Sequence, residues 1–377
     1  MKIGVNTRLL LKGKLTGIGW FTYQTLRYIT NAHPEHTFYF FFDRPYNEEF
    51  VFSSNVVPVV LGPKARHPIL FRIWMDIRVL RKARQLGIEA FISPEGMLPL
   101  KLHAPCLTVI HDLNFEHYPN DLAKSHSRYY RKYFPLFCRK AARIATVSEY
   151  SKQDICKQYD INPSKIDVVY NGVNEWFAPL DESKKGEVRN RLTEGHPYFI
   201  FVGMLHPRKN VHRLFDAFDR FKSEVLSDVK LLIVGEKLWW DGEISEAYER
   251  MAHQQDVVFT GHLPSQELVE AMGASLALTY VPYFEGFGIP ILEGFKCGVP
   301  VITSNRTSMP EVAGDGAILV DPFSVQAIEW AMRQMVTNSD LRDQLVANGF
   351  ERLKHFSWEQ SAELLWGSFE KMMGERP

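Results

Sequence analysis

Residues 283–300 of this 377-residue chain read YFEGFGIPILEGFKCGVP and join a predicted strand to a short predicted helix. Gly286 and Gly288 permit backbone conformations that other residues resist. Pro290 suits the first turn of a helix, because its missing N–H costs nothing there, and Gly298 is typical of a residue that ends a helix. The stretch therefore predicts a helix whose N-terminal amides face open space, a geometry that binds anions and especially phosphate.

Two glutamates, Glu285 and Glu293, stand on either side of this turn. The backbone amides of Phe287, Gly288 and Ile289 would contact the anion, and Glu293, one turn into the helix, can reach back toward it. The same stretch is also consistent with an ordinary junction between a loop and a helix, in which both glutamates are solvated. Other segments of the chain are needed to choose between these interpretations.

The whole chain alternates between apolar runs and segments with helical spacing. Residues 20–29 and 210–221 have the apolar spacing of helices, and Ser308 with Glu311 forms a predicted capping box, as does Ser357 with Gln360. This alternation predicts an α/β protein with two doubly wound, Rossmann-like parallel sheets. The predicted strands span residues 2–6, 37–42, 91–93, 106–110, 144–147, 167–170, 199–203, 231–235, 257–260, 276–281 and 299–303.

A length of 377 residues exceeds what one hydrophobic core usually organises and predicts two domains. Residues 173–195 are polar and irregular before they become a charged helix, which places the domain boundary there and a linker at residues 176–189. Residues 1–175 would form the N-terminal domain and residues 190–357 the C-terminal domain.

The net charge is zero, but residues 1–180 hold 24 Lys and Arg against 15 Asp and Glu. A basic N-terminal half suggests an acidic substrate, a nucleic acid or an anionic membrane surface. The four cysteines show no zinc spacing and favour a reduced, cytoplasmic compartment. The N-terminal sequence predicts a strand rather than a signal peptide. No apolar run is long enough to span a bilayer, so any membrane contact would be peripheral.

Two N-terminal segments, residues 64–84 and 124–143, combine basic and aromatic side chains. Each carries seven Lys and Arg, with one acid in the first segment and none in the second. Such mixtures suit an anionic membrane interface or a phosphate-bearing lipid acceptor. They also suit nucleic acid, or two helices whose charged faces are simply solvated.

Residues 2–29 read as a strand, a glycine loop containing Gly17 and Gly19, and a helix, which is the phosphate-binding arrangement of nucleotide-binding α/β domains. Only two of the three glycines of a dinucleotide fingerprint are present, which disfavours a nicotinamide oxidoreductase. His111 follows the strand at residues 106–110, and ligands of open α/β sheets bind at such strand ends. A purely structural histidine is the alternative.

Arg208 and Lys209 follow another predicted strand and lie at the same edge of the second sheet as the Glu285 turn. A guanidinium, an ammonium and helix amides that converge on one anion fit a diphosphate better than a carboxylate. Glu293 would then accept hydrogen bonds from the vicinal hydroxyls of a ribose. The chain contains no Asp-x-Asp pair, so no metal is implied.

Six ordered motifs, and a seventh that is the most specific, resemble those of glycosyltransferase family 4, and the similarity covers nearly the whole chain. The six are TGIG (16–19), VIHD (109–112), TVSEYSKQDI (146–155), VVYNGV (168–173), FVGMLHPRKN (201–210) and FTGHLP (259–264), and the most specific is Glu285-Gly-Phe-Gly-Ile-Pro-Ile-Leu-Glu293. The resemblance implies two Rossmann-like domains that face each other across a cleft (GT-B fold), with residues 358–377 returning to the N-terminal, acceptor-binding domain. It also implies retaining transfer of a sugar from a nucleotide donor without a required metal or other cofactor.

Family roles can be carried onto the matching residues. Arg208 and Lys209 resemble the diphosphate-binding pair, Glu293 the ribose-binding glutamate and Glu285 the residue that meets donor-sugar hydroxyls. His111 resembles the residue beside the anomeric centre. The backbone amides of Gly17, Phe287 and Gly288 would bind the donor, and the loop containing His262 and Leu263 would lie near its base. Many members have Gly-Arg where this chain has Gly203-Met204, so the phosphate charge would rest more heavily on Arg208.

The expected reaction is therefore a same-face displacement that joins a sugar to a glycan or lipid-linked glycan. The family resemblance implies that the sugar is mannose and that the reaction belongs to surface-polysaccharide assembly. The enzyme would be cytoplasmic, with peripheral contact at the inner face of the membrane as a further expectation, and nucleic acid is not an expected partner. Two other classes stay open: a GT-B epimerase or phosphorylase, and a non-catalytic protein that binds nucleotide sugars. Formation of a new glycosidic bond would distinguish a glycosyltransferase from both of these other classes.

Overall fold

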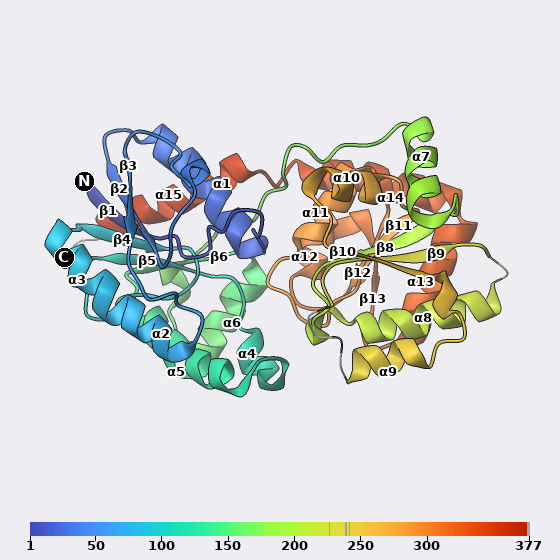
Figure 1. Ribbon diagram of the computed structural model, residues 1–377, viewed down its shortest axis with the longest axis horizontal. Coiled ribbons are helices and arrows are strands. Elements are labelled where there is room, and N and C mark those ends of the chain that lie inside the picture. The colour runs from blue at the N-terminus through green and yellow to red at the C-terminus, as the bar shows by residue number, and fades with distance from the viewer. Residues whose placement is uncertain (226, 238–239, 241, 375–377) are drawn as a thin grey trace. The chain divides into compact units, whose positions relative to one another are not determined.

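The computed structural model describes residues 1–225, 227–237, 240 and 242–374. It divides the chain into two compact units, one formed by Met1–Gly172 with the C-terminal segment from Ser357, and the other by Val173–Phe356. Each unit is built on one parallel β-sheet covered by helices (Figure 1). The predicted α/β class with two parallel sheets is confirmed. The segment predicted as a linker, residues 176–189, belongs to the second unit and includes the start of helix α7 (Glu182–Thr193).

The first unit contains a seven-stranded sheet with the order β3-β2-β1-β4-β5-β6-β7. From β1 the chain adds β2 and β3 on one side, and it then returns to add β4, β5, β6 and β7 on the other side of β1. The order in which strands are added therefore changes side between β1 and β4, although the two strands are parallel. The strands are β1 (Lys2–Asn6), β2 (Thr37–Phe42), β3 (Val56–Val60), β4 (Ala90–Ser93), β5 (Cys106–Ile110), β6 (Arg143–Thr146) and β7 (Ile166–Val168).

Helices α1 and α15 pack together on one face of this sheet, and α2, α3 and α5 lie on the other (Figure 1). The predicted capping of α15 is confirmed, because Ser357 Oγ accepts the Gln360 N–H at 3.1 Å. The helices are α1 (Gly17–Ala32), α2 (Pro68–Arg72), the π-helical η2 (Ile73–Val79), α3 (Leu80–Leu86), α4 (Asn114–His117), α5 (Lys124–Lys140), α6 (Glu149–Tyr159) and α15 (Trp358–Gly374), with short 3-10 turns η1 (Glu48–Phe50), η3 (Pro119–Asp121) and η4 (Pro163–Lys165).

The second unit contains a six-stranded sheet with the order β10-β9-β8-β11-β12-β13. Its strands are β8 (Tyr198–Val202), β9 (Lys230–Val234), β10 (Val257–Gly261), β11 (Ala277–Tyr280), β12 (Val301–Ser304) and β13 (Ala317–Val320). Its helices are α7, α8 (Val211–Glu224), α9 (Glu243–Glu249), α10 (Ser265–Gly273), α11 (Ile289–Lys296), α12 (Met309–Ala313), α13 (Val325–Thr337) and α14 (Ser339–Leu353), with 3-10 turns η5 (Pro207–Lys209), η6 (Gln254–Asp256) and η7 (Gly314–Gly316).

Two outer strands, β3 and β13, were missing from the sequence prediction. Strand β3 contains Pro58 and is partly exposed, as edge strands can be, so its pattern is that of a loop. Strand β13 is only four residues long and is exposed in its middle. The central strands were predicted within about two residues, because a strand buried on both faces reads as a continuous apolar run.

Candidate functional site

The loops that follow β8 and β11 meet at the centre of the second sheet. These strands are neighbours, yet the chain continues from β8 toward β9 and β10 and from β11 toward β12 and β13. Open α/β sheets bind ligands at such a reversal, beyond the carboxyl ends of the strands. Arg208 and Lys209 lie in the loop after β8, and Glu285 lies in the loop after β11.

Hydrogen bonds fasten these two loops together. The side-chain amide of Asn210 donates to the carbonyl oxygens of Val281, at 3.1 Å, and Pro322, at 2.7 Å. The Tyr283 N–H donates to the Arg208 carbonyl oxygen at 3.1 Å. The cationic side chains of the first loop are therefore held beside the turn that carries the glutamate.

Arg208, Lys209 and Glu285 form one ion cluster in which the Glu285 carboxylate pairs with both cations. The Lys209 ammonium also donates to the Tyr280 hydroxyl at 2.5 Å. Burial by itself would raise the pKa of Glu285, but the charges and hydrogen bonds of Arg208 and Lys209 outweigh it and lower this pKa to about 2. Glu285 is therefore ionised near neutral pH.

This arrangement differs in one respect from the arrangement that the sequence predicted. The two cations were expected to meet a bound anion while Glu285 acted separately, but here Glu285 is itself the anion between them. The side chains of Arg208 and Lys209 are 24% and 14% exposed, so both can be reached from solvent. A multiply charged anion can then share them with the carboxylate, since each cation carries several N–H donors.

Ser308 has a different role from the predicted one. The capping box is wrong, because the Ser308 side chain makes no capping hydrogen bond at the start of α12. Its hydroxyl donates instead to the carbonyl oxygens of Glu285, at 2.9 Å, and Phe287, at 3.3 Å. The neighbouring Thr307 hydroxyl accepts the Glu285 N–H at 3.4 Å. The loop after β12 thus fixes the backbone of the glutamate turn, which a local Ser-x-x-Glu pattern cannot reveal.

The N-terminus of α11 is more enclosed than the sequence indicated. Gly288 precedes it with φ 99°, and a Cβ there would lie 2.8 Å from Met309 Cε. Phe287 is 3% exposed and packs edge-on against Phe356, with 5.6 Å between the ring centroids. Ile289 is half-buried. Packing from two other segments of the unit therefore shapes this terminus.

Glu293 lies in α11 and is half-buried, and burial is the cause of its pKa shift. Burial raises the pKa of Glu293 to about 7. Two carboxyl groups in one loop-helix segment thus differ in pKa by several units, since only Glu285 has the two cations beside it.

In the first unit, His111 follows β5 and is half-buried. Its Nε2 lies 2.8 Å from the Pro94 carbonyl oxygen, and its ring packs edge-on against Phe21 of α1, with 5.1 Å between the centroids. Burial lowers the pKa of His111, so the imidazole is neutral and carries its proton on Nε2. Gly17 is the exposed first residue of α1, and Gly19 is buried, with Leu9 and Leu15 close to where a Cβ would stand.

His262 and Leu263 follow β10 at the carboxyl edge of the second sheet. His262 is exposed and Leu263 is half-buried. One strand, β9, separates them from the loop after β8.

A polar cluster absent from the prediction lies just beyond the parallel neighbours β1 and β4 in the first sheet. The Asn6 side-chain amide donates to Ser93 Oγ at 3.1 Å and to Glu95 Oε1 at 2.7 Å. The Arg8 guanidinium pairs with the same Glu95 carboxylate and lies 4.9 Å from the ring centroid of Phe71. The sequence gives no periodic signal for this cluster, because its members come from three separate segments.

The two basic segments form one surface, which we call the basic face. It consists of α2, η2 and α3 beside α5, where Phe71 packs on Tyr129 at 5.5 Å and Arg72 lies 5.0 Å from the Tyr133 ring centroid. Exposed isoleucines follow each other at four-residue spacing: Ile69, Ile73 and Ile77 are 65%, 37% and 45% exposed. The exposed cations of the two basic segments are Lys64, Arg66, Arg72, Arg78, Arg81, Arg84, Lys124, Arg128, Arg131, Lys132 and Arg139.

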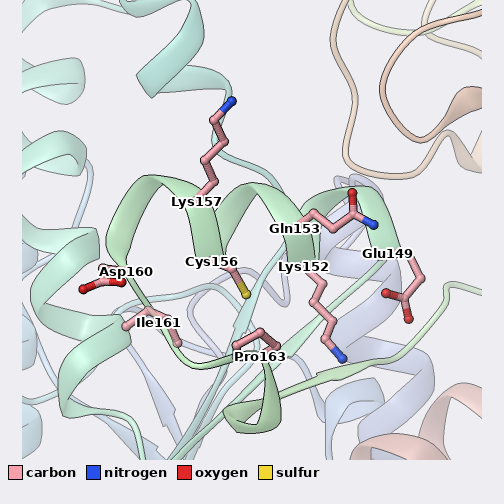
Figure 2. Close-up of a pocket in the computed structure, with 8 residues that line it drawn as sticks. All are labelled: Glu149, Lys152, Gln153, Cys156, Lys157, Asp160, Ile161 and Pro163. Atoms are coloured by element: carbon pink, nitrogen blue, oxygen red, sulfur yellow. The ribbon is translucent and has the colours of Figure 1, made fainter.

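A surface pocket of about 470 Å³ lies along α6, and none of the predicted site residues lines it (Figure 2). Figure 2 shows Lys157 pointing away from Cys156 and Pro163, so the lining groups do not converge on one point. Within the described residues, no three His, Cys, Asp or Glu side chains are grouped so that they could hold a metal ion. No helix among them is both long and apolar enough to cross a membrane.

Two family profiles match successive parts of the chain. Residues 15–177 match the profile described as Glycosyltransferase Family 4, and residues 183–352 match that of Glycosyl transferases group 1. Among relatives, the chain is 28% identical to the O-antigen chain mannosyltransferase B of Escherichia coli over 298 residues, 78% of each chain. It is 27% identical to the O-antigen chain mannosyltransferase RfbU of Salmonella typhimurium over 298 residues, 77% of this chain and 78% of the relative.

Solved structures with the same fold include sucrose-phosphate synthase from Thermosynechococcus elongatus, with a TM-score of 0.78, 16% identity and full coverage of both chains. Another is Anabaena HepE in complex with UDP and glucose, with a TM-score of 0.75, 16% identity and full coverage of both chains. At this identity the likeness concerns the fold alone.

Proposed function

We propose that this protein, a glycosyltransferase of family 4 with the GT-B fold, transfers mannose. The donor would be a nucleotide-diphosphate sugar, and the acceptor a glycan or a lipid-linked glycan. The ion cluster of Arg208, Lys209 and Glu285 carries the proposal, because it places two cations where a doubly wound sheet binds its ligand. The choice of mannose follows the names of the two O-antigen relatives.

The donor diphosphate would contact Arg208 and Lys209 from their exposed sides. A guanidinium binds two phosphate oxygens in its planar fork, and an ammonium adds a compact charge. As these donors turn toward phosphate, the Glu285 carboxylate becomes available to accept hydrogen bonds from sugar hydroxyls. Glu293 would accept hydrogen bonds from the ribose, and backbone groups around Gly288 and Leu263 would contact the phosphate and base.

We propose a same-face displacement that retains the anomeric configuration. The bond between the anomeric carbon and the diphosphate oxygen breaks, that oxygen takes the proton of the acceptor hydroxyl, and the acceptor oxygen bonds to the same face. Arg208 and Lys209 stabilise the negative charge that grows on the leaving group, so the reaction requires no metal. His111 is neutral and directs its Nε2–H at the Pro94 carbonyl oxygen, so Nδ1 is its unprotonated ring nitrogen.

The test uses the purified full-length chain with GDP-mannose and UDP-glucose as probes. Binding is measured as thermal stabilisation, since a ligand that binds only the folded state raises its stability. Transfer to an alkyl mannoside is then followed by NMR, which reports both a new glycosidic bond and its anomeric configuration. Retention supports the proposed mechanism, inversion contradicts it, and a product without a new glycosidic bond contradicts glycosyl transfer itself.

Lys209→Ala should lower turnover about 10²–10³-fold, the usual loss for one donor that stabilises a developing oxyanion. Lys230→Ala is the matched control, because Lys230 also forms an ion pair, with Asp256 at 2.6 Å, but lies at the first residue of β9, at the opposite edge of the sheet from the loop after β8. Equal losses in both variants would show that Lys209 acts only through stability.

We also propose that the basic face rests on an anionic membrane surface at the cytoplasmic side, where a lipid-linked acceptor would be found. Charge complementarity supports this partner, since each Lys or Arg near an anionic surface contributes about 1 kcal/mol. The exposed isoleucines Ile69, Ile73 and Ile77 can enter the interface between headgroups and acyl chains.

Flotation with phosphatidylcholine vesicles, with and without phosphatidylglycerol, tests the membrane proposal. Ile73→Asp should weaken binding to the anionic vesicles, whereas Leu364→Asp, an exposed leucine on α15, should not. Binding to a duplex DNA fragment at the same salt concentration, without vesicle binding, would contradict it.

A further inference from the structure

Tyr280 is a buried polar residue at the centre of the ion cluster that the sequence did not point to. It ends β11, is 0% exposed, and its ring stacks on Phe201 of β8 with 6.4 Å between the centroids. Its hydroxyl lies 2.5 Å from the Lys209 ammonium, which also lies 4.8 Å from the centre of the same ring. The phenol therefore contacts Lys209 through both its oxygen and its ring face.

The Tyr280 hydroxyl keeps its proton. Burial, followed by the charge of the neighbouring Glu285, raises the pKa of Tyr280 well above its ordinary value. A neutral phenol has one O–H donor and an oxygen that accepts. Tyr280 can therefore accept from Lys209 and donate to the Glu285 carboxylate, with which it is hydrogen-bonded.

This contact matters because of the nature of lysine. A lysine ammonium sits on a flexible four-carbon stem, so it loses rotamer entropy when it is held in one position. In the cluster, the Lys209 ammonium contacts both the Glu285 carboxylate and the Tyr280 hydroxyl. A diphosphate competes with the carboxylate for the ammonium, but the phenol sits in the rigid end of a central strand and does not move away.

We propose that Tyr280 is a positioning residue, which holds the Lys209 ammonium at the point where the donor diphosphate binds. The inference rests on the proposed function, in which Lys209 meets the diphosphate. It assigns Tyr280 no contact with the donor, so its effect passes through Lys209.

Tyr280→Phe tests this role, because it removes the hydroxyl and leaves the ring that packs on Phe201. Tyr198→Phe is the matched control. Tyr198 is also 0% exposed, and its hydroxyl donates to the Ala271 carbonyl oxygen at 2.7 Å, but it lies at the start of β8, at the opposite edge of the sheet. The measured quantities are kcat and KM for transfer from GDP-mannose, with thermal unfolding to show that each variant is folded.

Tyr280→Phe should lower kcat roughly 10-fold, the effect of losing a hydrogen bond to a charged group, with a smaller change in KM. Tyr198→Phe should lower the unfolding temperature but leave kcat unchanged. In a Lys209→Met background, Tyr280→Phe should cause no further loss of kcat.

Three results are decisive. If Tyr280→Phe changes kcat no more than Tyr198→Phe does, the hydroxyl is only structural and the inference is wrong. If it lowers kcat as much in the Lys209→Met background, Tyr280 acts independently of Lys209 and the inference is again wrong. A wild-type chain that neither binds nor cleaves any nucleotide sugar overturns the proposed function as well, whereas an active wild type with an unaffected Tyr280→Phe variant overturns this inference alone.

Discussion

Replacing Glu293 with Gln should remove a large pH dependence from the stability of the second unit. Burial raises the pKa of Glu293 from 4.5 to about 7 in the folded chain. Below pH 4.5 the carboxyl is protonated in both the folded and the unfolded state, so it costs nothing. Between pH 4.5 and pH 7 the unfolded state loses this proton while the folded state keeps it, so the free energy of unfolding falls over this range and levels off above pH 7, where both states are ionised.

The size of this effect follows from the shift. A difference of about 2.5 pKa units at 1.36 kcal/mol per unit gives about 3 kcal/mol, developed between pH 4.5 and pH 8. Partial exposure makes this an upper value. In a unit of this size, each kcal/mol changes the unfolding temperature by about 2–4 °C.

The assay is urea unfolding of the wild type and of Glu293→Gln at a series of pH values from 5 to 8. The variant should be more stable than the wild type by less than about 1 kcal/mol at pH 5 and by up to about 3 kcal/mol at pH 8. Glu285→Gln is the matched control. The pKa of Glu285 is lowered to about 2, so its contribution to stability is lost only as the pH falls below about 4.5, and its variant should show a constant difference across this range. If the free energy of unfolding depended on pH in the same way for the wild type and for Glu293→Gln, burial would not raise the pKa of Glu293, and the reasoning would be wrong.

Three further outcomes are expected. Affinity for GDP-mannose, measured by calorimetry, should rise between pH 6 and pH 8 as Glu293 ionises, and Glu293→Gln should abolish this rise; a pH-independent wild type would contradict the ribose assignment. Ser308→Ala should cost about 1 kcal/mol in urea unfolding and raise KM for the donor, because it removes the hydroxyl that holds the Glu285 turn; an unchanged KM would show that the turn keeps its shape unaided. Gly235→Ala should prevent folding, because its Cβ would lie 1.9 Å from the Gly203 carbonyl oxygen after β8. Gly186→Ala in α7 has open space around its Cβ and should be neutral or slightly stabilising. Circular dichroism of both variants measures whether each one is folded, and a folded Gly235→Ala variant would contradict the first expectation.

Much of this protein could be predicted from local sequence. A strand buried on both faces needs an unbroken apolar run, so the central strands are visible without any knowledge of their neighbours. The glycines and the proline of residues 283–300 specify a turn and a helix through their own backbone preferences. The edge strand β3, partly exposed and interrupted by Pro58, lacks that local signature.

The α/β alternation, the two cations after β8 and the two glutamates after β11 can all be read from the amino-acid sequence. Which of these charges meet depends on how the strands pair in the folded chain. Arg208 and Glu285 are 77 residues apart, and parallel pairing of β8 with β11 brings them into contact. The same packing gives Glu285 two cations and leaves Glu293 with burial alone, so their pKa values move in opposite directions. Ionisation depends on distances and on water exclusion, and neither is a property of the chain until it has folded.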